Sequence, residues 1–169
     1  MITKVADVRD IVKAGAVNPR KVFPNIKALA KSDDWVKREV SATALVEISK
    51  KHPEKVVAEM LSWTQDDDPN VRRASSEGLR HIARKHPAAV LPVLENLNAD
   101  SNLYVRKSVA NLLRNAGNYD ADFILDVCSR WAKRRDPNTN WIVKDGLRKL
   151  RQTRATEVDK ILASLSVTV

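Results

Sequence analysis

The side chains best suited to chemistry in this sequence are basic residues that recur every 34 to 37 positions. They stand outside the apolar positions of their segments, so we expect them to face solvent. Rows of arginine and lysine neutralise the phosphates of a nucleic acid and release its counterions. The columns of this predicted phosphate-binding surface are Arg73, Lys107 and Lys144; Arg80, Arg114 and Arg151; and Arg38, Arg72 and Arg106, with Arg84 and Arg148 nearby.

The sequence gives little support to other kinds of site. It has no glycine-rich phosphate loop and no Cys/His cluster at zinc-binding spacing, so we expect no cofactor and no metal. His52 and His86 each stand in a Lys-His-Pro triplet, which indicates a helix end more than a ligand. Cys128 falls on an apolar face and is expected in the core. The acidic run 66–68 predicts a helix cap.

The four tryptophans fall into two groups. Trp63 and Trp131 lie in short amphipathic segments, where packing in the core is expected. Trp35 follows Asp-Asp and Trp141 follows Asn-Thr-Asn, so both stand near the start of a segment. For these two, core packing and a flat ligand platform both remain open, because a base stacks on the same apolar surface.

Composition limits the class of protein and of partner. A chain of 169 residues with 43% hydrophobic residues is long enough for one domain with a buried core. Four glycines are few for a turn-rich β architecture, so helices are favoured. A formal charge of +9 should attract nucleic acid, anionic lipid or an acidic protein. A soluble basic protein without a polyanionic partner is the alternative on charge alone.

Cysteine usage and hydropathy indicate the compartment. Cys128 is the only cysteine, so no internal disulfide can form and a reducing compartment fits. The N-terminal run MITKVADVRD lacks the apolar stretch of a signal peptide. No segment approaches the roughly 18 uninterrupted apolar residues of a membrane span. We therefore expect a cytoplasmic monomer with no membrane partner.

One segment shows the helical pattern most clearly. Val71, Ala74, Leu79 and Ile82 share a helical face, together with a glycine at position 78. The residues before them, Asp-Asp-Pro, are typical of a helix start. Pro87 disfavours α geometry in the residue before it, so the pattern predicts one helix of about 15 residues that ends near position 86.

The same pattern repeats along the chain. Leu45, Leu79 and Leu113 are 34 residues apart, and a fourth copy offset by 37 would pair Leu113 with Leu150. The loop DPNTN (136–140) would supply the three extra residues. Shorter amphipathic helices lie between these copies, and two helices in a period near 34 predict an all-α, right-handed α-solenoid. Homologous positions of adjacent repeats would then stand side by side.

We expect a single domain over residues 1–169, built from four to five helical hairpins. Their approximate ranges are 3–31 as an N-terminal cap, 19–52, 53–86, 87–118 and 119–152, with 153–166 as a cap helix.

The run DDPNVRRASSEGLRHIARKHP (67–87) resembles HEAT repeats, with tetratricopeptide repeats as the second choice. The resemblance implies that the second helix of each hairpin lines a concave surface. It also implies that Arg38, Arg72 and Arg106 could pair with an aspartate of the preceding turn, such as Asp67, Asp68 or Asp100, instead of binding a ligand.

A narrower resemblance covers roughly residues 33–152. The motifs DPNVRRASSEGLR, YVRKSVANLLRN and WIVKDGLRKL are similar to the DNA alkylation repair family, the HEAT-like-repeat alkylpurine DNA glycosylases. This implies binding of duplex, possibly alkylated, DNA in a basic concave cleft. In catalytically competent members it also implies release of cationic alkylated purines.

Family site residues carry over position by position. Trp35 matches the Trp that opens the catalytic helix, and Glu39 matches the carboxylate four residues later, although an alignment on the His-Pro pair puts Arg38 there. Arg73 matches a DNA-facing arginine. The second active-site Trp falls at Asn111, so full catalytic machinery is not expected.

Three hypotheses follow. The first is a DNA-binding HEAT-like protein that does not cleave the glycosidic bond. The others are an active alkylpurine DNA glycosylase that uses Trp35 and Glu39, and a non-catalytic scaffold whose concave surface holds an acidic protein segment.

Overall fold

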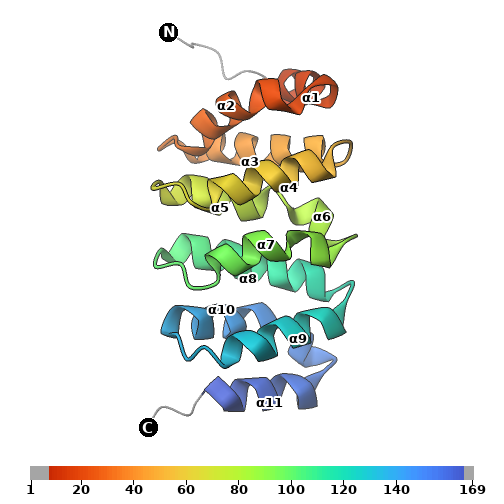
Figure 1. The fold of residues 1–169 in the computed structure, drawn as a ribbon, viewed down its shortest axis with the longest axis vertical. Coiled ribbons are helices and arrows are strands. Elements are labelled where there is room, and N and C mark those ends of the chain that lie inside the picture. The colour runs from red at the N-terminus through yellow and green to blue at the C-terminus, as the bar shows by residue number, and fades with distance from the viewer. Residues whose placement is uncertain (1–7, 166–169) are drawn as a thin grey trace. The chain divides into compact units, whose positions relative to one another are not determined.

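Helices make up all the regular structure in residues 8–165, the part of the chain that the computed structural model describes (Figure 1). The all-α prediction is therefore confirmed. The chain divides after Ile82 into two compact units, which we call the N-terminal and C-terminal units and describe separately. The predicted first hairpin begins, and the predicted cap helix ends, outside the described residues. The single domain over 1–169 stays a prediction.

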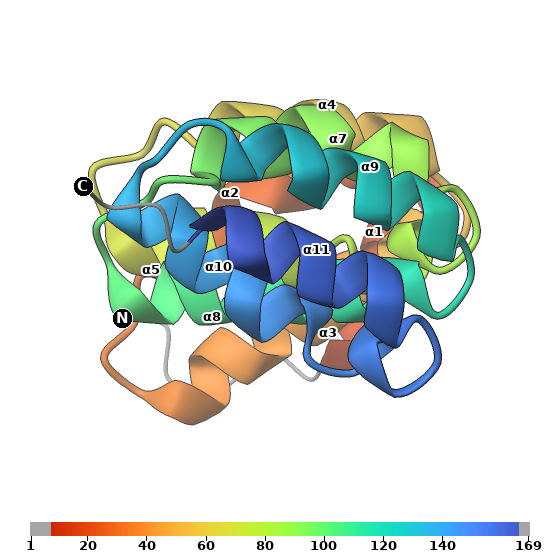
Figure 2. The same cartoon turned by 90° about the horizontal axis from the view of Figure 1, so that it is seen from below.

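Each unit is built from helices that alternate between two layers. The N-terminal unit contains α1 (Val8–Val17), α2 (Pro19–Ala30), α3 (Trp35–Ser49), α4 (Pro53–Trp63) and α5 (Pro69–Glu77), and the unit boundary falls within the short α6 (Arg80–Ala83). The C-terminal unit contains α7 (Pro87–Leu97), α8 (Leu103–Gly117), α9 (Ala121–Ala132), α10 (Pro137–Leu147), the 3-10 helix η1 (Leu150–Gln152) and α11 (Ala155–Leu165). Within the C-terminal unit, α7 and α9 lie in one layer and α8 and α10 in the other (Figure 2). We call α3, α5, α8 and α10 the second helices.

The second helices all begin with the same capping device. Their N-cap residues are spaced 34 residues apart, and each side chain accepts a hydrogen bond from a first-turn N–H. These caps are Asp34, Asp68, Asn102 and Asp136. Short polar side chains at this position satisfy N–H groups that the helix leaves free. The predicted cap in the run 66–68 is thus confirmed at Asp68.

The predicted offset of 37 residues for the fourth copy is wrong. Leu45, Leu79, Leu113 and Leu147 form one column at a constant spacing of 34, and all four are 0% exposed. Leu150, the predicted member, lies in η1 and is half-buried. The cause is local. Asp136 accepts hydrogen bonds from the N–H (2.8 Å) and hydroxyl (3.1 Å) of Thr139, so residues 137–140 enter α10 instead of forming a loop.

The predicted 15-residue helix near position 78 is also wrong, because it is interrupted after Glu77. Ser75 and Ser76 donate hydrogen bonds to the carbonyls of Arg72 (2.6 Å) and Arg73 (3.0 Å). Back-bonding of this kind weakens a helix, and glycine has low helix propensity. Together with Gly78 these serines account for the break between α5 and α6.

Second helices approach closely where a leucine of the 34-residue column contacts a glycine in, or directly after, the next second helix. In the N-terminal unit, a Cβ built on Gly78 would lie 2.8 Å from Cβ of Leu45 in α3. In the C-terminal unit, a Cβ on Gly146 would lie 2.8 Å from Cδ1 of Leu113 in α8. Each glycine follows its leucine by 33 residues. The same contact therefore joins consecutive second helices in both units.

The expected core residues are buried. Trp63 and Trp131 are 1% and 0% exposed, and each indole N–H donates to a glutamate carboxylate. Cys128 is fully buried, and burial raises the pKa of its thiol to about 12. The thiol is therefore neutral at physiological pH and unreactive in the folded chain. Within residues 8–165, no helix combines the length and apolar composition that crossing a lipid bilayer requires.

Asp66 ties the turn before α5 to α2. Its carboxylate lies 2.7 Å from Nζ of Lys27 and 3.7 Å from Nζ of Lys31, and it accepts the N–H of Asp68 at 3.0 Å. Burial by itself raises the pKa of this carboxyl, but these hydrogen bonds and the two ammonium charges outweigh burial and hold the pKa below its usual value of 3.8. The turn is thus fixed by an ionised carboxylate.

The leucine-glycine contacts predict that two similar glycine substitutions lower the free energy of unfolding by different amounts. Gly78→Ala should lower the free energy of unfolding by about 1–3 kcal/mol, because Leu45 Cβ is fixed to its backbone and cannot move aside. Gly146→Ala should cost less, because the nearest atom is the rotatable end of Leu113. Urea denaturation of both variants measures the difference. Gly117→Ala is the control, since its Cβ would meet Ile124 only at 3.7 Å. Equal behaviour of all three variants would contradict close helix approach at Gly78.

Candidate nucleic-acid interface

The arginines of one predicted column bind the turns that precede their helices. These are Arg38, Arg72 and Arg106. Each Nη1 donates to the main-chain carbonyls five and six residues earlier. The contacts are Arg38 with Ser32 (2.7 Å) and Asp33 (2.8 Å), Arg72 with Asp66 (2.9 Å) and Asp67 (3.0 Å), and Arg106 with Asp100 (3.0 Å) and Ser101 (2.7 Å). The expected contact with the preceding turn is thus present, and these bonds go to main-chain carbonyl oxygens, among them those of Asp66, Asp67 and Asp100.

Trp35 and Glu39 lie on the solvent side of α3. Trp35 is the first helical residue after the cap, and the residue is 69% exposed, so it does not pack in the core. The side chain of Glu39, one turn later, is 53% exposed, and its carboxylate is 3.9 Å from Nη2 of Arg80. Arg80 is therefore the cation that faces this carboxylate. An exposed ring and a carboxylate therefore stand one helical turn apart.

Arg73 and Arg80 both contact Glu77, one at its carboxylate and the other at its main-chain carbonyl. Arg73 places Nε at 2.9 Å and Nη2 at 2.8 Å from Oε1 of Glu77. Arg80 donates from Nε to the main-chain carbonyl of Glu77 at 3.1 Å. The N-terminal unit thus presents alternating charges along α3, α5 and α6, not the predicted row of cations with little intervening acid.

In the C-terminal unit, Asp145 of α10 lies between two arginines. Arg114 of α8 donates from Nη1 to the Asp145 carboxylate (2.7 Å) and carbonyl (3.0 Å), and the two side chains are 19% and 23% exposed. Arg148 is 3.6 Å from the same carboxylate and 72% exposed. Arg114 is therefore fixed in a helix-helix contact. Arg148 is held loosely, since exposed ion pairs contribute only about 0–1 kcal/mol.

Asn111, predicted at the position of the family's second active-site Trp, belongs to a polar network. Its carbonyl accepts from the amide of Asn115 at 2.9 Å, and its side-chain oxygen is 3.5 Å from Nη2 of Arg114. Arg84 donates to Asn115 at 3.0 and 3.3 Å. The structure therefore brings Arg84, Asn111 and Arg114 together.

The remaining residues of the predicted phosphate-binding surface differ in their exposure and in the contacts they make within the chain. Lys107 is exposed and lies 5.4 Å from the ring centre of Tyr104, which is 63% exposed. Lys144 is exposed on α10. Trp141 is half-buried beneath the guanidinium of Arg106, 5.7 Å from its ring centre. Arg151 lies in η1 and pairs with Asp159 at 2.7 Å, so it is not on a second helix.

The corrected 34-residue register changes the columns. Arg73 and Lys107 continue to Trp141, and Arg80 and Arg114 continue to Arg148. Lys144 and Arg151, placed in these columns by the offset of 37, belong to neither.

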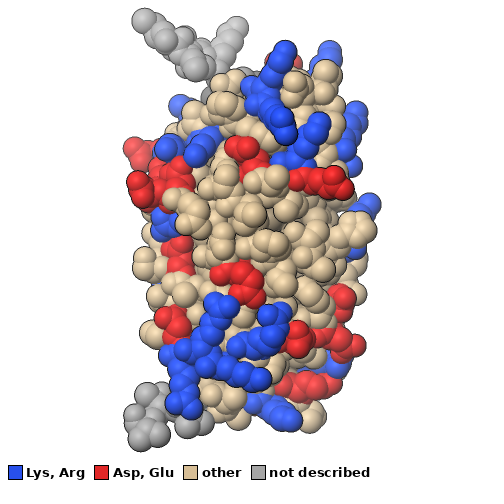
Figure 3. All heavy atoms as spheres, in the orientation of Figure 1, with Lys and Arg blue, Asp and Glu red and all other residues tan. Residues whose placement is uncertain are grey.

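Glu77, Asp145 and one basic cluster were not predicted from the sequence. Glu77 stands four residues after Arg73, a spacing that indicates an ion pair on a helix and could have been used. For Asp145, the sequence offers only Arg148 three residues later, whereas its closer partner Arg114 is on another helix. Exposed basic residues also gather in the last turn of α9 and directly after it, at Arg130, Lys133, Arg134 and Arg135. Figure 3 shows lysine and arginine side chains gathered over this part of the C-terminal unit.

Comparison with known proteins matches the chain to a repeat family and to a solved structure of a DNA repair enzyme. The family described as HEAT repeats matches residues 22–114, more than half of the chain. The structure of Pseudomonas fluorescens alkylpurine DNA glycosylase AlkC, bound to DNA containing an abasic-site analogue, is similar with 28% identity and a TM-score of 0.74. The alignment covers 90% of this chain but 44% of that protein, so this chain spans less than half of its length. No curated protein matches the sequence.

Proposed function

The chain belongs to the HEAT-repeat family, and from that premise we propose that it binds duplex DNA through its second helices. The observation that carries the proposal is the similarity, over 90% of the chain, to a glycosylase whose structure contains DNA. The expected resemblance to HEAT-like-repeat alkylpurine DNA glycosylases is confirmed at this level. Damaged or alkylated DNA as the preferred ligand, action as a monomer and a location in the cytoplasm are further parts of the proposal.

The physical support comes from the cations that remain accessible. Lys107, Lys144 and Arg148 are exposed on α8, on α10 and at the end of α10. Arg148 can exchange its loose contact with Asp145 for a phosphate oxygen at little cost. Arg114, Arg38 and Arg106 instead hold the backbone and neighbouring helices in position. In this proposal the fixed arginines shape the surface, and the exposed Lys107, Lys144 and Arg148 neutralise phosphate.

A salt series tests DNA binding. We expect wild-type affinity for duplex DNA to fall steeply with salt, as counterion release requires. Lys107→Glu with Arg148→Glu should lower affinity and reduce the slope of log K against log salt by about 2, that is about 0.9 per lost phosphate contact. The measurement is fluorescence anisotropy with a labelled duplex.

The matched control reverses two exposed lysines outside the second helices, Lys55 in α4 and Lys160 in α11. This variant has the same net charge and should bind DNA nearly as wild type does. Equal losses of DNA affinity in the two double variants would show that only net charge matters. They would reject the assignment of DNA binding to the second helices. No binding by wild type at low salt would reject DNA as the partner and favour an acidic protein segment.

An active glycosylase is the second candidate, because Trp35 exposes its ring and Glu39 exposes a carboxylate one turn away. A flat ring can hold a displaced base, and a carboxylate can oppose positive charge developing on the sugar. We favour a protein that binds without base release. Asn111 stands where a second aromatic is expected, and Glu39 already faces Arg80.

The assay for base release uses duplex DNA with a cationic alkylated purine. We expect wild type to bind this DNA but release little or no base, with Glu39→Gln indistinguishable from it. Glu54→Gln, an exposed glutamate in α4, is the control. Robust release by wild type that is lost in Glu39→Gln would establish the glycosylase instead. Release that survives in Glu39→Gln would also reject the non-catalytic proposal and would assign the carboxylate role to another residue.

A further inference from the structure

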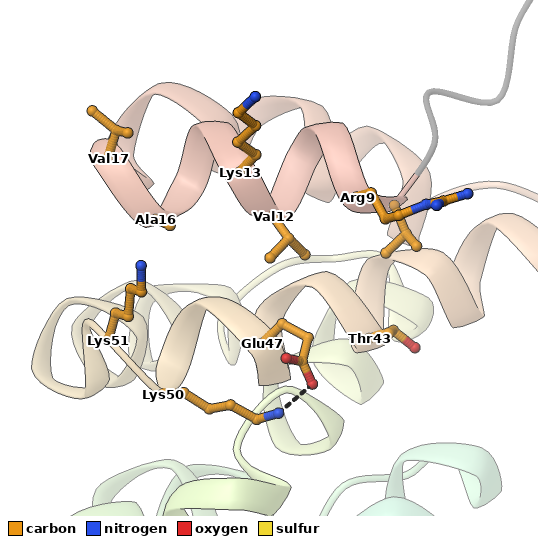
Figure 4. A pocket seen from close by; sticks show the side chains of 10 residues that line it. Arg9, Val12, Lys13, Ala16, Val17, Thr43, Glu47, Lys50 and Lys51 are labelled. Carbon is orange, nitrogen blue, oxygen red and sulfur yellow. Dashed lines mark hydrogen bonds and ion pairs between the residues drawn. The ribbon is translucent and has the colours of Figure 1, made fainter.

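A groove of about 630 Å³ lies between α1 and α3 in the N-terminal unit (Figure 4). The side chains of Val12 and Ala16 point from α1 toward α3, and Glu47 and Thr43 line the α3 side. The groove takes no part in the DNA-binding proposal above. It needs a separate explanation because its lining combines an aliphatic floor with a basic rim.

The walls of the groove are fixed by the fold. On its buried side, α1 packs against α3 through Gly15, where an added Cβ would collide with Ile48. At its C-terminal end, the carbonyl of Ala16 lies 2.9 Å from Nε2 of His52, the residue before α4. The groove is therefore preformed, so a ligand would not have to pay for opening it.

The floor offers aliphatic surface to a ligand. Val12 and Ala16 are half-buried, whereas Val17, the last residue of α1, is 83% exposed. No aromatic residue lines the groove. Aliphatic side chains of a protein segment can fill such a floor. Unpaired bases, by contrast, need flat rings for stacking, and a phosphate backbone has no apolar group to bury.

The rim carries an excess of positive charge. Four of the lining residues are basic, namely Arg9, Lys13, Lys50 and Lys51, against one acid, Glu47. Lys50 already pairs with that acid at 2.6 Å. Lys13 is on the solvent side of α1, and Lys51 rises toward α1 from the other wall (Figure 4). Carboxylates of a ligand would therefore meet Lys51 beside the aliphatic floor and Lys13 at the outer edge of α1.

We propose that the α1–α3 groove binds an acidic amphipathic helix of a partner protein. Apolar residues at helical spacing would fill the floor over Val12 and Ala16 and extend onto Val17 at the end of α1, and carboxylates on the flanks would pair with Lys13 and Lys51. This is the helix-in-groove mode of recognition. The 10 residues of α1 give a groove about 15 Å long, which matches about three turns of a ligand helix.

The test uses a labelled synthetic peptide with leucines at i, i+3, i+4 and i+7 and glutamates on the other face. A scrambled peptide of identical composition accompanies it. We expect the patterned peptide to bind the full chain at least about tenfold more tightly than the scrambled one, because only helical spacing fits the floor. Val17→Asp, and separately Lys13→Glu with Lys51→Glu, should each weaken binding about tenfold or more.

Two controls distinguish peptide binding in the groove from non-specific charge attraction and from DNA binding. Lys55→Glu with Lys160→Glu makes the same charge change and should leave peptide binding intact. Lys13→Glu with Lys51→Glu should bind duplex DNA as wild type does, so the two proposals can fail independently. Val17 is exposed, so Val17→Asp should fold, and the melting temperature checks this. The lysine variant provides the test should Val17→Asp unfold.

Three results would overturn the proposal. Equal affinity for both peptides would show charge attraction without a groove. Loss of DNA binding but not of peptide binding in the Lys13/Lys51 variant would assign the groove to nucleic acid. Self-association of the wild-type chain that Val17→Asp abolishes, measured by sedimentation, would assign it to a second copy.

Discussion

The close approach of consecutive second helices is the constraint on which the site depends. Leu45 against Gly78 in one unit, and Leu113 against Gly146 in the other, leave no room for a Cβ between the helices. At this separation the polar edges of neighbouring helices are brought within reach of one another. The contact of Arg114 with both the carboxylate and the carbonyl of Asp145 is the direct result. Helix packing therefore decides which cations are fixed and which remain mobile.

The turns before the second helices impose a second constraint with a similar effect. An Asp or Asn caps each helix, and in three of the four copies an arginine in the first turn reaches back to two carbonyls of the preceding turn. Hydrogen bonds from a charged group to carbonyls contribute more than neutral ones, about 1.5–3 kcal/mol. These guanidinium groups consequently stabilise the frame of the surface. The chain thus uses arginine for structure, while exposed lysines and Arg148 remain for a ligand.

Much of the fold could be predicted from the sequence, because caps, prolines and buried leucines are local signals that repeat. The leucine spacing and the burial of Trp63, Trp131 and Cys128 followed from periodicity alone. The fourth repeat was placed three residues late, because the hydrogen bonds of Thr139 to Asp136 make a helix of residues that look like a loop. The pairing of Asp145 with Arg114 and of Glu39 with Arg80 could not be predicted, since each partner lies on another helix. The basic residues of the site and Glu39 were therefore predicted, whereas Glu77 and Asp145 were missed.

The central claim is that DNA contacts the second helices, and lysine footprinting tests it most directly. Acetylation of the chain with and without duplex DNA, read by mass spectrometry, compares lysines within one sample. The account predicts that DNA protects Lys107 and Lys144, while Lys55 in α4 and Lys160 in α11 react equally in both samples. All four residues are exposed in the free chain, so differences arise from the ligand. Equal protection of all four lysines, or protection of Lys55 and Lys160 alone, would contradict the account.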